Sequence, residues 1–378
     1  MPEPLWRRTP LIHSTTLSKN TNASVYLKLE NLQPSYSFKY RGISYFIQKA
    51  KETRGEELHC IIASGGNAGV AAACAARRLG VKCTVFIPEG VAQSTLAILK
   101  QEGAEVVVIG RFYAESLGVA EQAVEADPNA IMVPAYDDPV VWEGHSSIIV
   151  EIQDQLQKKP DAIFCSVGGG GLLGGIILGC KEVGWDDVPI VTLETVGSDC
   201  FYRSITMNGS GFNKESKVLP SGVELLHNAE HDVDMAHFKG FSSRASGSLG
   251  ASQPAAGVLR MALDRPGGIR SYSVQDELSM GSLVKFANDH KMLVELACST
   301  TLVPAYHPTL FNQMVPPTSK MRCVVFIVCG GFKVSTLDVM EFQKIIEEDL
   351  ENPESCWQVQ CDDGVLYEVP KQIVVNGK

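Results

Sequence analysis

The 378-residue sequence lacks several features that mark whole classes of protein. It has no excess of basic residues: the net charge is −10 and the isoelectric point about 5.4, whereas nucleic acids and anionic membranes attract basic surfaces. No run approaches the roughly 18 apolar residues that a membrane-spanning helix needs. Arg7 and Arg8 are not followed by the apolar stretch of a secretory signal. We therefore expect a cytoplasmic protein that binds neither nucleic acid nor membrane.

The eleven cysteines never form a CxxC pair, so they predict neither a disulfide framework nor a zinc site. Cys60, Cys165 and Cys323 instead lie within apolar, strand-like runs. Buried, reduced thiols of an intracellular protein are the simplest interpretation. We also expect no transition-metal site among the eight histidines.

What the chain does contain is enough apolar material for a large core. Hydrophobic residues make up 45% of it and the mean hydropathy is +0.03, which at this length favours two domains. Apolar runs that predict strands alternate with periodic segments that predict helices, an order typical of a parallel sheet covered by helices. The predicted strands are residues 24–30, 59–63, 83–88, 105–109, 162–167 and 189–194. The predicted helices are residues 70–79, 95–102, 113–126, 142–156 and, together with the glycine loop that opens it, 168–182.

The second half of the chain is less regular. Residues 207–254 show little periodicity, and we expect them to form a long, partly ordered excursion. Order returns with predicted helices at 276–289 and 300–306 and predicted strands at 292–295 and 323–328. Ser335 and Asp338 have the spacing of a capping box at the start of a last helix. The sequence after residue 352 predicts no structure.

One lysine, Lys39, lies within the segment 35–42, beside Phe38 and just before an amphipathic stretch. An aromatic neighbour can shield an amine from water and so lower its proton affinity. A lysine that forms a Schiff base needs this unprotonated state. Most lysines are solvated surface groups, so the segment alone does not predict a function.

The strongest motif is a run of four glycines between a predicted strand and a predicted helix: Gly168, Gly169, Gly170 and Gly171. Backbone N–H groups at such a turn converge at the positive end of a helix dipole and can bind phosphate. The spacing also fits GxGxxG with Gly174, and Glu194 follows twenty residues later, as in a dinucleotide fingerprint. An NAD-dependent dehydrogenase is therefore an alternative, although it gives Lys39 no role.

Two further loops follow predicted strands. Residues 64–69 begin with Ser64 and open a helix, so their amides could bind a carboxylate while Asn67 bonds a phenolic oxygen. Cys329, with two glycines after it, ends the last apolar run, at the edge where open α/β sheets bind ligands. Each loop alone could equally be an ordinary turn or a packed thiol.

Together and in this order, the four motifs resemble the fold-type II pyridoxal-phosphate enzymes, and within them the eukaryotic L-serine dehydratase/L-threonine deaminase branch. The resemblance runs from about residue 9 to about residue 345 and includes the phrases at 142–145 and 182–185. It implies an α/β fold of the tryptophan synthase β type, with two open, mostly parallel, twisted sheets flanked by helices. The implied domains are a large one of residues 1–39 and 135–345, a small one of residues 40–134 inserted in it, and an extension, 346–378, of unknown structure.

The resemblance also implies a role for each matching residue. Lys39 would hold pyridoxal 5′-phosphate through a Schiff base and then act as the base at the substrate Cα, with Phe38 beside the ring. The glycines at 168–171 would hold the phosphate, and Asn67 the 3′-oxygen. The substrate carboxylate would be bound by Ser64, which could also relay a proton, and by the loop behind it, namely Gly65, Asn67 and Ala68.

Cys329 would face the pyridine nitrogen. A thiol cannot keep that nitrogen protonated as an aspartate would, so the ring is a weaker electron sink and a long-lived carbanion is disfavoured. Elimination is then favoured over transamination. L-Serine would give pyruvate and ammonia, and L-threonine 2-oxobutyrate and ammonia.

A monovalent cation such as K⁺ is also implied near Glu194. The implied ligands are Gly168, Glu194, Ser198, Leu249 and Ala251. Hard oxygen ligands suit such an ion, although a glutamate that merely ends a strand is nearly as consistent with the sequence.

Some positions depart from the family pattern. Gly65 stands where active members often have Ala or Ser, and Phe332 and Lys333 replace a small polar pair. The segment 207–239 is longer than expected. We expect a homodimeric enzyme of amino-acid catabolism and gluconeogenesis that acts on a small amino acid. A serine racemase, a β-replacement enzyme and an inactive relative that only binds ligands are the alternatives, with the dehydrogenase more remote.

Overall fold

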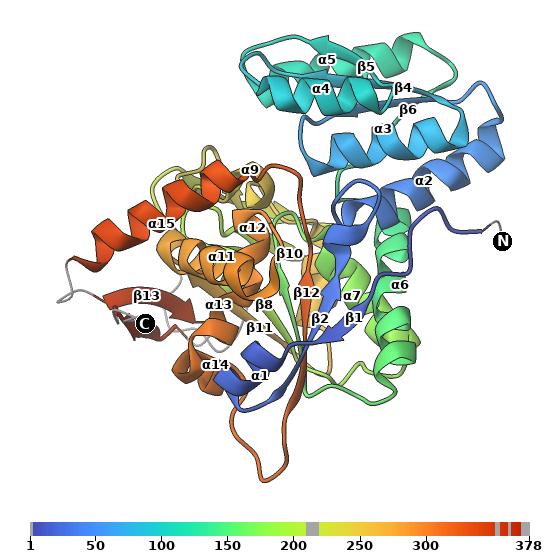
Figure 1. Cartoon of the computed structure of the whole chain (residues 1–378). Helices are drawn as coiled ribbons and strands as arrows, with labels where there is room; N and C mark the ends of the chain where they lie inside the picture. Colours follow the sequence, from blue (N-terminus) through green and yellow to red (C-terminus); the bar gives the residue numbers. More distant parts are fainter. Residues whose placement is uncertain (1–2, 209–218, 352–355, 362–363, 372–378) are drawn as a thin grey trace.

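The computed structural model describes residues 3–208, 219–351, 356–361 and 364–371. Within them the strands form one eight-stranded sheet, one four-stranded sheet and a separate hairpin (Figure 1). The larger sheet has the spatial order β1 (Leu11–His13), β2 (Ser24–Leu29), β12 (Cys323–Val328), β7 (Ala162–Ser166), β8 (Ile190–Thr195), β11 (Ile269–Val274), β13 (Cys356–Cys361), β14 (Leu366–Pro370). The smaller has the order β5 (Glu105–Val108), β4 (Lys82–Ile87), β3 (His59–Ala63), β6 (Ala130–Met132).

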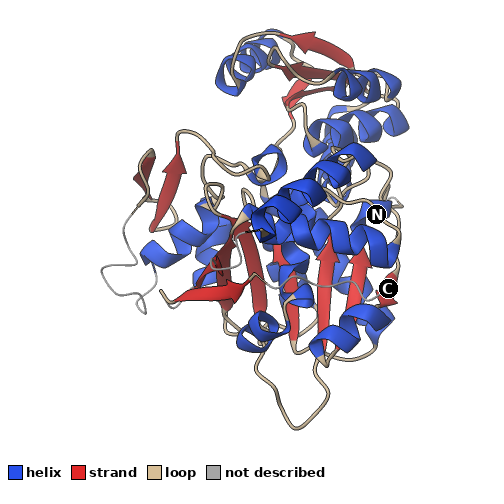
Figure 2. Ribbon diagram, turned by 60° about the vertical axis from the view of Figure 1, so that its left-hand side comes forward, coloured by secondary structure: helices blue, strands red, loops and turns tan. Residues whose placement is uncertain are grey.

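The central strands of both sheets are parallel. In the larger sheet β2, β12, β7, β8 and β11 run the same way, and antiparallel strands are added at the two edges (Figure 2). The smaller sheet is parallel throughout. Central parallel strands are covered on both faces, so they are apolar along their whole length, and every residue of β12 is buried. The predicted α/β class with two open, mostly parallel sheets is confirmed.

Helices cover both sheets. Those beside the larger sheet are α1 (Thr15–Thr21), α6 (Pro139–Leu156), α7 (Gly171–Glu182), α8 (Cys200–Asn208), α9 (Ser246–Leu249), α10 (Ala256–Leu263), α11 (Asp276–His290), α12 (Leu296–Ser299), α13 (Val303–Tyr306), α14 (Pro308–Met314) and α15 (Thr336–Leu350), with the 3₁₀ turns η1 (Glu30–Leu32) and η2 (Thr300–Leu302). Those around the smaller sheet are α2 (Lys39–Arg54), α3 (Asn67–Leu79), α4 (Gln93–Gln101) and α5 (Tyr113–Ala126).

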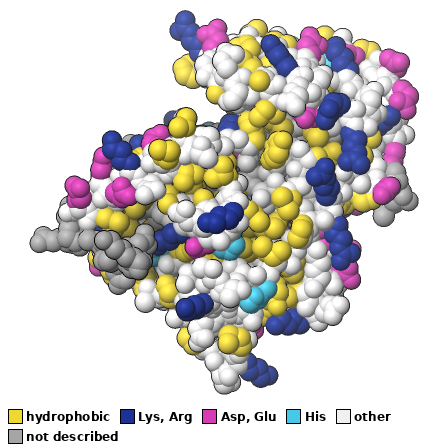
Figure 3. All heavy atoms as spheres, in the orientation of Figure 1, with side chains coloured by type: hydrophobic (Ala, Val, Ile, Leu, Met, Phe, Trp, Pro, Cys, Tyr) yellow, Lys and Arg dark blue, Asp and Glu magenta, His cyan; other side chains and the backbone are white. Residues whose placement is uncertain are grey.

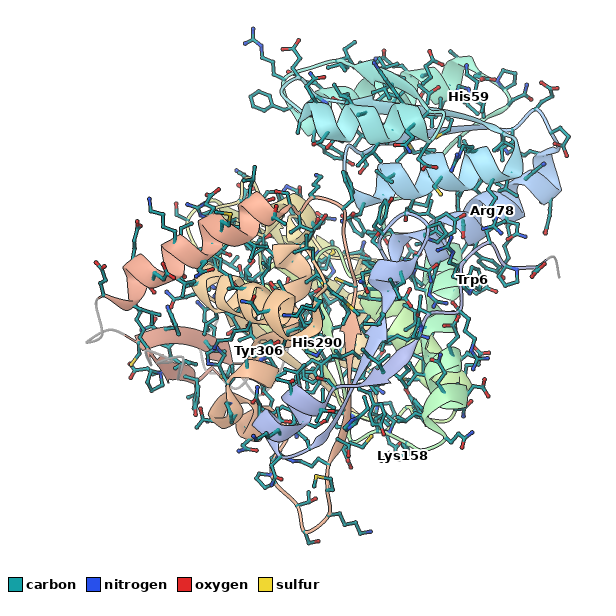
Figure 4. The ribbon with its side chains drawn as sticks, viewed as in Figure 1. Trp6, His59, Arg78, Lys158, His290 and Tyr306 are labelled. Atoms are coloured by element: carbon teal, nitrogen blue, oxygen red, sulfur yellow. The ribbon has the colours of Figure 1, made fainter. Side chains whose placement is uncertain are left out.

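Each sheet has its own hydrophobic core. Residues of β2, β7, β8 and β12 form one cluster with α6 and α7, and residues of β3 and β4 form another with α2 and α3. The N-terminal segment reaches the second cluster, because Leu5 and Trp6 pack against it and Arg78 donates a hydrogen bond to the Leu5 carbonyl (Figure 4). The N-terminal segment, predicted within the large domain, thus contacts the small sheet.

Several local predictions are confirmed by the helix termini. Gly80, at φ +71°, ends α3 in the left-handed conformation that favours glycine. Ser335 and Asp338 form the predicted capping box at the start of α15. The α/β elements from β3 to β8 follow the predicted order, with ends shifted by a few residues at most, except that β6 was not predicted.

One other local prediction is wrong, and two segments for which no strand was predicted contain strands. Residues 292–295 form no strand; they connect α11 to α12, and the side chain of Glu295 is engaged with other segments. The excursion predicted at 207–254 contains a regular hairpin, β9 (Val223–Asn228) and β10 (Val233–Phe238), whose second strand is mostly buried and contacts α8. Residues 209–218 of that excursion lie outside the described part of the chain. The C-terminal extension supplies β13 and β14, which widen the large sheet.

Charged side chains of both signs are interspersed over the face in Figure 3. No helix in the described ranges is both long and apolar enough to cross a bilayer.

Candidate active site

Lys39 is the first residue of α2, and the segment before it is pinned to the end of β12. Ser37 pairs with Gly330, and the Phe38 N–H donates to the Cys329 carbonyl at 3.0 Å. The structure therefore brings the lysine segment and the Cys329 loop together, although they are almost 300 residues apart in the sequence. The start of a helix and the end of a central strand are both rigid, which fixes the position of the lysine.

The Lys39 amine has no carboxylate within ion-pair distance in the described part of the chain. It donates a hydrogen bond of 2.6 Å to the Ala135 carbonyl and lies 5.4 Å from the ring centroid of Phe38 and 5.8 Å from that of Tyr136. Burial lowers the pKa of this amine to about 8, with Cys329 opposing the change. An ordinary lysine has a pKa near 10.4, so Lys39 is unprotonated far more often at neutral pH.

Two helices, α7 and α3, have no side chain capping their N-terminal amides. The N-cap of α7 is Gly170, at φ +95°, and the N-cap of α3 is Gly66; neither can offer a side-chain acceptor. The first amides of an α-helix have no partner within the helix, and they attract anions. The site thus offers two anion positions, one on each domain.

The glycine loop is also shaped by close packing. A Cβ on Gly169 would lie 2.4 Å from the Tyr136 ring, and one on Gly168 would lie 3.0 Å from the Leu249 carbonyl oxygen. A side chain at either position would displace its neighbour. With a reactive amine nearby, this bare helix start fits the phosphorylated aldehyde cofactor that the resemblance implies, with Lys39 as its covalent partner and the amides at 168–171 as its phosphate ligands.

Asn67 is held by residues that the sequence analysis did not identify. Its Nδ2 donates to both Glu295 carboxylate oxygens, at 3.2 and 3.1 Å, and to Ser248 Oγ at 3.2 Å, while its Oδ1 accepts the Phe332 N–H at 3.2 Å. Glu295 also accepts a hydrogen bond from Ser248. To bond a 3′-oxygen as predicted, Asn67 would exchange one of these contacts. A glutamate within the apolar run 293–297 was the feature of the sequence that could have indicated this role.

The predicted carboxylate loop connects β3 to α3. Ser64 Oγ accepts the Gly66 N–H at 3.2 Å, which places the hydroxyl over the start of the helix. Ala68 is buried in the core of the small sheet, so only its amide can face a ligand. A Cβ on Gly65 would lie 3.2 Å from Ile87 Cγ2, so the smaller residue leaves the loop less tightly packed than alanine would.

Cys329 is almost fully buried at the carboxyl end of β12. Its Sγ lies 3.5 Å from Ser166 Oγ, at the end of the neighbouring strand β7. The Cys298 thiol accepts the Gly330 N–H at 3.3 Å, and burial raises the pKa of Cys298 well above its usual range. The Cys329 loop therefore carries hydroxyl and thiol groups, without a carboxylate in hydrogen-bond contact with its sulfur among the described residues.

The predicted cation ligands gather around the start of α8. Glu194 is fully buried at the end of β8, accepts the N–H groups of Phe201 and Tyr202 at 3.0 and 2.5 Å, and has a pKa raised well above the usual value by burial. The Gly168 carbonyl accepts from the Cys200 thiol at 3.5 Å, and a Cβ built on Gly168 would lie 3.0 Å from the Leu249 carbonyl oxygen. Ala251 packs against Cys200, and Ser198 lies in the turn after β8.

These contacts contradict the dinucleotide interpretation of the glycine run. The dehydrogenase fingerprint needs Glu194 free to bond a ribose, but both of its oxygens accept backbone N–H groups of α8.

One histidine pair, His227 and His231, has the four-residue spacing that suits zinc when it lies on a helix. Here His227 lies in β9, where it pairs with Asp234 at 2.9 Å, and His231 follows in a turn. In the described residues no three or more His, Cys, Asp and Glu side chains gather at one potential metal site.

Comparisons with known proteins agree with the geometry. The family model described as "Pyridoxal-phosphate dependent enzyme" matches residues 3–330. The L-serine dehydratase/L-threonine deaminase of Bos taurus is 37% identical over 352 residues, 92% of this chain and 97% of that protein. A serine dehydratase-like protein of Mus musculus is 35% identical over 343 residues, 90% of this chain and 95% of its own. The crystal structure of an L-serine ammonia-lyase from Rhizomucor miehei matches with a TM-score of 0.78 at 30% identity, covering 90% of this chain and 99% of that one. The chain therefore belongs to the family of pyridoxal-phosphate dependent enzymes.

Proposed function

We propose that this protein is an L-serine/L-threonine ammonia-lyase. It would eliminate water from the amino acid and release ammonia, giving pyruvate from L-serine and 2-oxobutyrate from L-threonine. The observation that carries the proposal is the Lys39 amine, with a pKa lowered to about 8, beside two uncapped helix starts and the Cys329 thiol. The names of the relatives from Bos taurus and Rhizomucor miehei support the same activity.

Lys39 has two roles in this proposal. Its amine carries the cofactor, and it later accepts the proton from the substrate Cα. When bound, the cofactor supplies an electron sink for the negative charge that this proton leaves behind. A base works best when its pKa is near the operating pH, and the lowered pKa of Lys39 meets that condition. The Ala135 carbonyl holds the amine in place before the cofactor binds.

The two anion positions divide the binding work between cofactor and substrate. The amides at 168–171 would hold the cofactor phosphate at the start of α7. The amides of residues 65–68 and the Ser64 hydroxyl would hold the substrate carboxylate at the start of α3. Phe38, whose ring lies 5.4 Å from the Lys39 amine, would cover one side of the cofactor.

Cys329 supports elimination over transamination. Its environment at the end of β12 contains the Ser166 hydroxyl at 3.5 Å. A thiol does not stabilise a positive charge on a facing nitrogen as a carboxylate would. A substrate carbanion is therefore best avoided, by loss of the β-hydroxyl with or directly after the α-proton.

We extend the proposal to a K⁺-like ion beside Glu194. A fully buried carboxylate whose pKa is raised by burial gains from a nearby cation. The Gly168, Leu249 and Ala251 backbone and Ser198 would supply the other oxygen ligands. Activity that rises with KCl, but not with the same concentration of tetramethylammonium chloride, would support this ion; equal activity in both salts would contradict it.

The test of the main proposal is an absorbance spectrum of the purified protein before and after addition of L-serine. A visible band that changes with L-serine, and that is lost in Lys39→Ala, is expected. Borohydride reduction followed by peptide mapping should find the pyridoxyl group on Lys39. Absence of that label would contradict the assignment and favour an inactive relative.

Product analysis tests the reaction type. Release of pyruvate and ammonia from L-serine is expected; accumulation of D-serine without pyruvate would show a racemase, and product formed only with an added thiol would show a β-replacement enzyme.

The resemblance also leads us to propose a homodimer in the cytoplasm that supplies carbon from amino acids to gluconeogenesis. Light scattering of the purified protein tests the dimer, and fluorescence microscopy of a tagged chain tests the location.

A further inference from the structure

Lys333 lies next to the active site on a tightly held turn. It follows Gly330 and Gly331, whose φ angles of +86° and +125° turn the chain away from β12. Its backbone N–H donates to Glu295 Oε1 at 2.8 Å. A Cβ on Gly331 would lie 2.1 Å from the Glu295 carboxyl carbon, so the turn sits directly on that side chain. The backbone of Lys333 is therefore fixed relative to Asn67, which Glu295 also holds.

The residue before it links the turn to the small sheet. The Phe332 N–H donates to Asn67 Oδ1 at 3.2 Å, and the Phe332 ring packs against the hydrophobic cluster of β3, β4 and α3. This double contact holds the turn over the loop between β3 and α3. The Lys333 side chain consequently extends toward the loop that binds the substrate carboxylate in the proposed function.

The Lys333 ammonium lies on the same side of that loop as the Ser64 hydroxyl. A Cβ built on Gly66 would be 3.6 Å from Lys333 Nζ and 3.6 Å from Ser64 Oγ. In the described part of the chain no carboxylate lies within 4.0 Å of Lys333 Nζ, the limit for an ion pair. The site thus contains a positive charge without a counter-ion beside the uncapped start of α3.

We propose that Lys333 is a specificity-determining residue that pairs with the α-carboxylate of the amino-acid substrate. The inference rests on the proposed function and adds a side-chain cation to the backbone amides of the loop. An ammonium is a compact point charge, and its hydrogen bonds to a carboxylate are stronger than those between neutral groups. Lys333 would thereby select substrates with a free carboxylate and lower the KM without taking part in the chemical step.

The first test measures binding without turnover. 3-Hydroxypropionate has the carboxylate and hydroxyl of serine but no amine, so it cannot react with the cofactor. Isothermal titration of the holoenzyme should show a Kd for this ligand that rises roughly three- to tenfold in Lys333→Gln. Lys333→Arg should remain within about twofold of wild type, because it keeps the charge. Lys320→Gln, at an exposed lysine in another loop, is the matched control and should show no change.

The second test separates binding from chemistry. In Lys333→Gln the KM for L-serine should rise by the same factor as the Kd, while kcat stays within about twofold. Lys333→Ala should behave alike, and it provides an independent variant should the glutamine variant fold poorly. Unchanged Kd and KM in Lys333→Gln or Lys333→Ala would overturn the proposal, and so would a fall in kcat alone. A wild type that does not bind 3-hydroxypropionate would also overturn it. A wild type that binds 3-hydroxypropionate but yields no pyruvate from L-serine would instead contradict the proposed function.

Discussion

Two cations at the start of α2, Lys39 and Arg41, lie two residues apart and have opposite surroundings. The Lys39 amine contacts a backbone carbonyl, and its pKa is lowered to about 8 by burial. The Arg41 guanidinium is fully buried, and it contacts Glu30 at 2.7 and 2.8 Å and Glu151 at 2.6 and 2.8 Å. Burial alone would lower the pKa of Arg41, but the two carboxylates outweigh it and raise the pKa.

The difference shows how the same helix turn serves chemistry and stability. Arg41 ties α2 to η1 through Glu30 and to α6 through Glu151, so it fixes the helix start on the large domain. Lys39, on that fixed helix start, has no carboxylate partner among the residues that the structure describes, which keeps its amine reactive. Removal of each side chain should therefore affect a different property.

The largest expected effect is that of Lys39→Ala on activity. Loss of both the covalent partner of the cofactor and the base should reduce kcat for L-serine by about 10³-fold or more. The midpoint of urea unfolding of the apoprotein should not fall, because the substitution removes a poorly solvated amine. Lys49→Ala, in the same helix and paired with exposed Glu143, is the control and should keep nearly full activity. Strong destabilisation by Lys39→Ala would show that the amine has a structural role.

Arg41→Ala should produce the largest loss of stability. It leaves the carboxylate of Glu30 buried without its partner, which typically costs about 3–5 kcal/mol. The change is measured as the shift in the urea unfolding curve of the apoprotein. Arg54→Ala, at the exposed end of the same helix, should cost less than about 1 kcal/mol. Equal shifts for the two variants would contradict the assigned role of the ion pairs.

Much of this contrast follows from sequence, but the partners do not. The short motif around Lys39 predicted a shielded amine. The strands 59–63 and 323–328 were predicted with their observed ends because they are short, mostly apolar runs. The carboxylates that hold Arg41 come from other elements, and Glu151 is 110 residues away along the chain. No local pattern encodes such a pairing.

The same limit applies to the rest of the site. Sequence motifs identified the glycine run, Asn67 and Cys329, because each follows a strand at a recognisable turn. Glu295 was missed as a partner of Asn67, since the two are 228 residues apart and the run before Glu295 predicted a strand. The hairpin β9–β10 was missed because neither of its strands alternates strictly between apolar and polar residues, and the segment around it is rich in polar residues.

The pH dependence should also separate the two cations. The pKa of Lys39 is about 8 in the folded protein and near 10.4 in the unfolded chain, so between these values the unfolded state binds more protons. The contribution of Lys39 to stability therefore improves as the pH rises from about 8 to about 10.4. The rate at which the apoprotein captures pyridoxal phosphate should rise up to tenfold per pH unit below 8 and level off above it. A capture rate that is constant from pH 6 to 9 would contradict the lowered pKa of Lys39.

Glu30 should respond at the other end of the pH scale. Burial would raise its pKa, but Arg41 and the hydrogen bond from Thr9 lower it in the folded protein. The stability from this pair is thus complete above about pH 4.3, the ordinary pKa of glutamate, and is lost as the pH falls below it.

The smallest effect is expected for Arg41→Lys, which keeps the charge but removes the planar fork. Arg41 makes two parallel contacts with Glu30 through Nε and Nη2 and also reaches Glu151 through Nη1, whereas one ammonium cannot satisfy both carboxylates in this geometry. We expect a loss of about 1–2 kcal/mol in unfolding free energy, smaller than for Arg41→Ala because the substitution keeps the positive charge. The substitution leaves Lys39 itself unchanged. Borohydride reduction of the holoenzyme should therefore still place the pyridoxyl group fully on Lys39. A clear fall in kcat under conditions where the Arg41→Lys protein is still fully folded would mean that Arg41 also sets the position of the reactive amine.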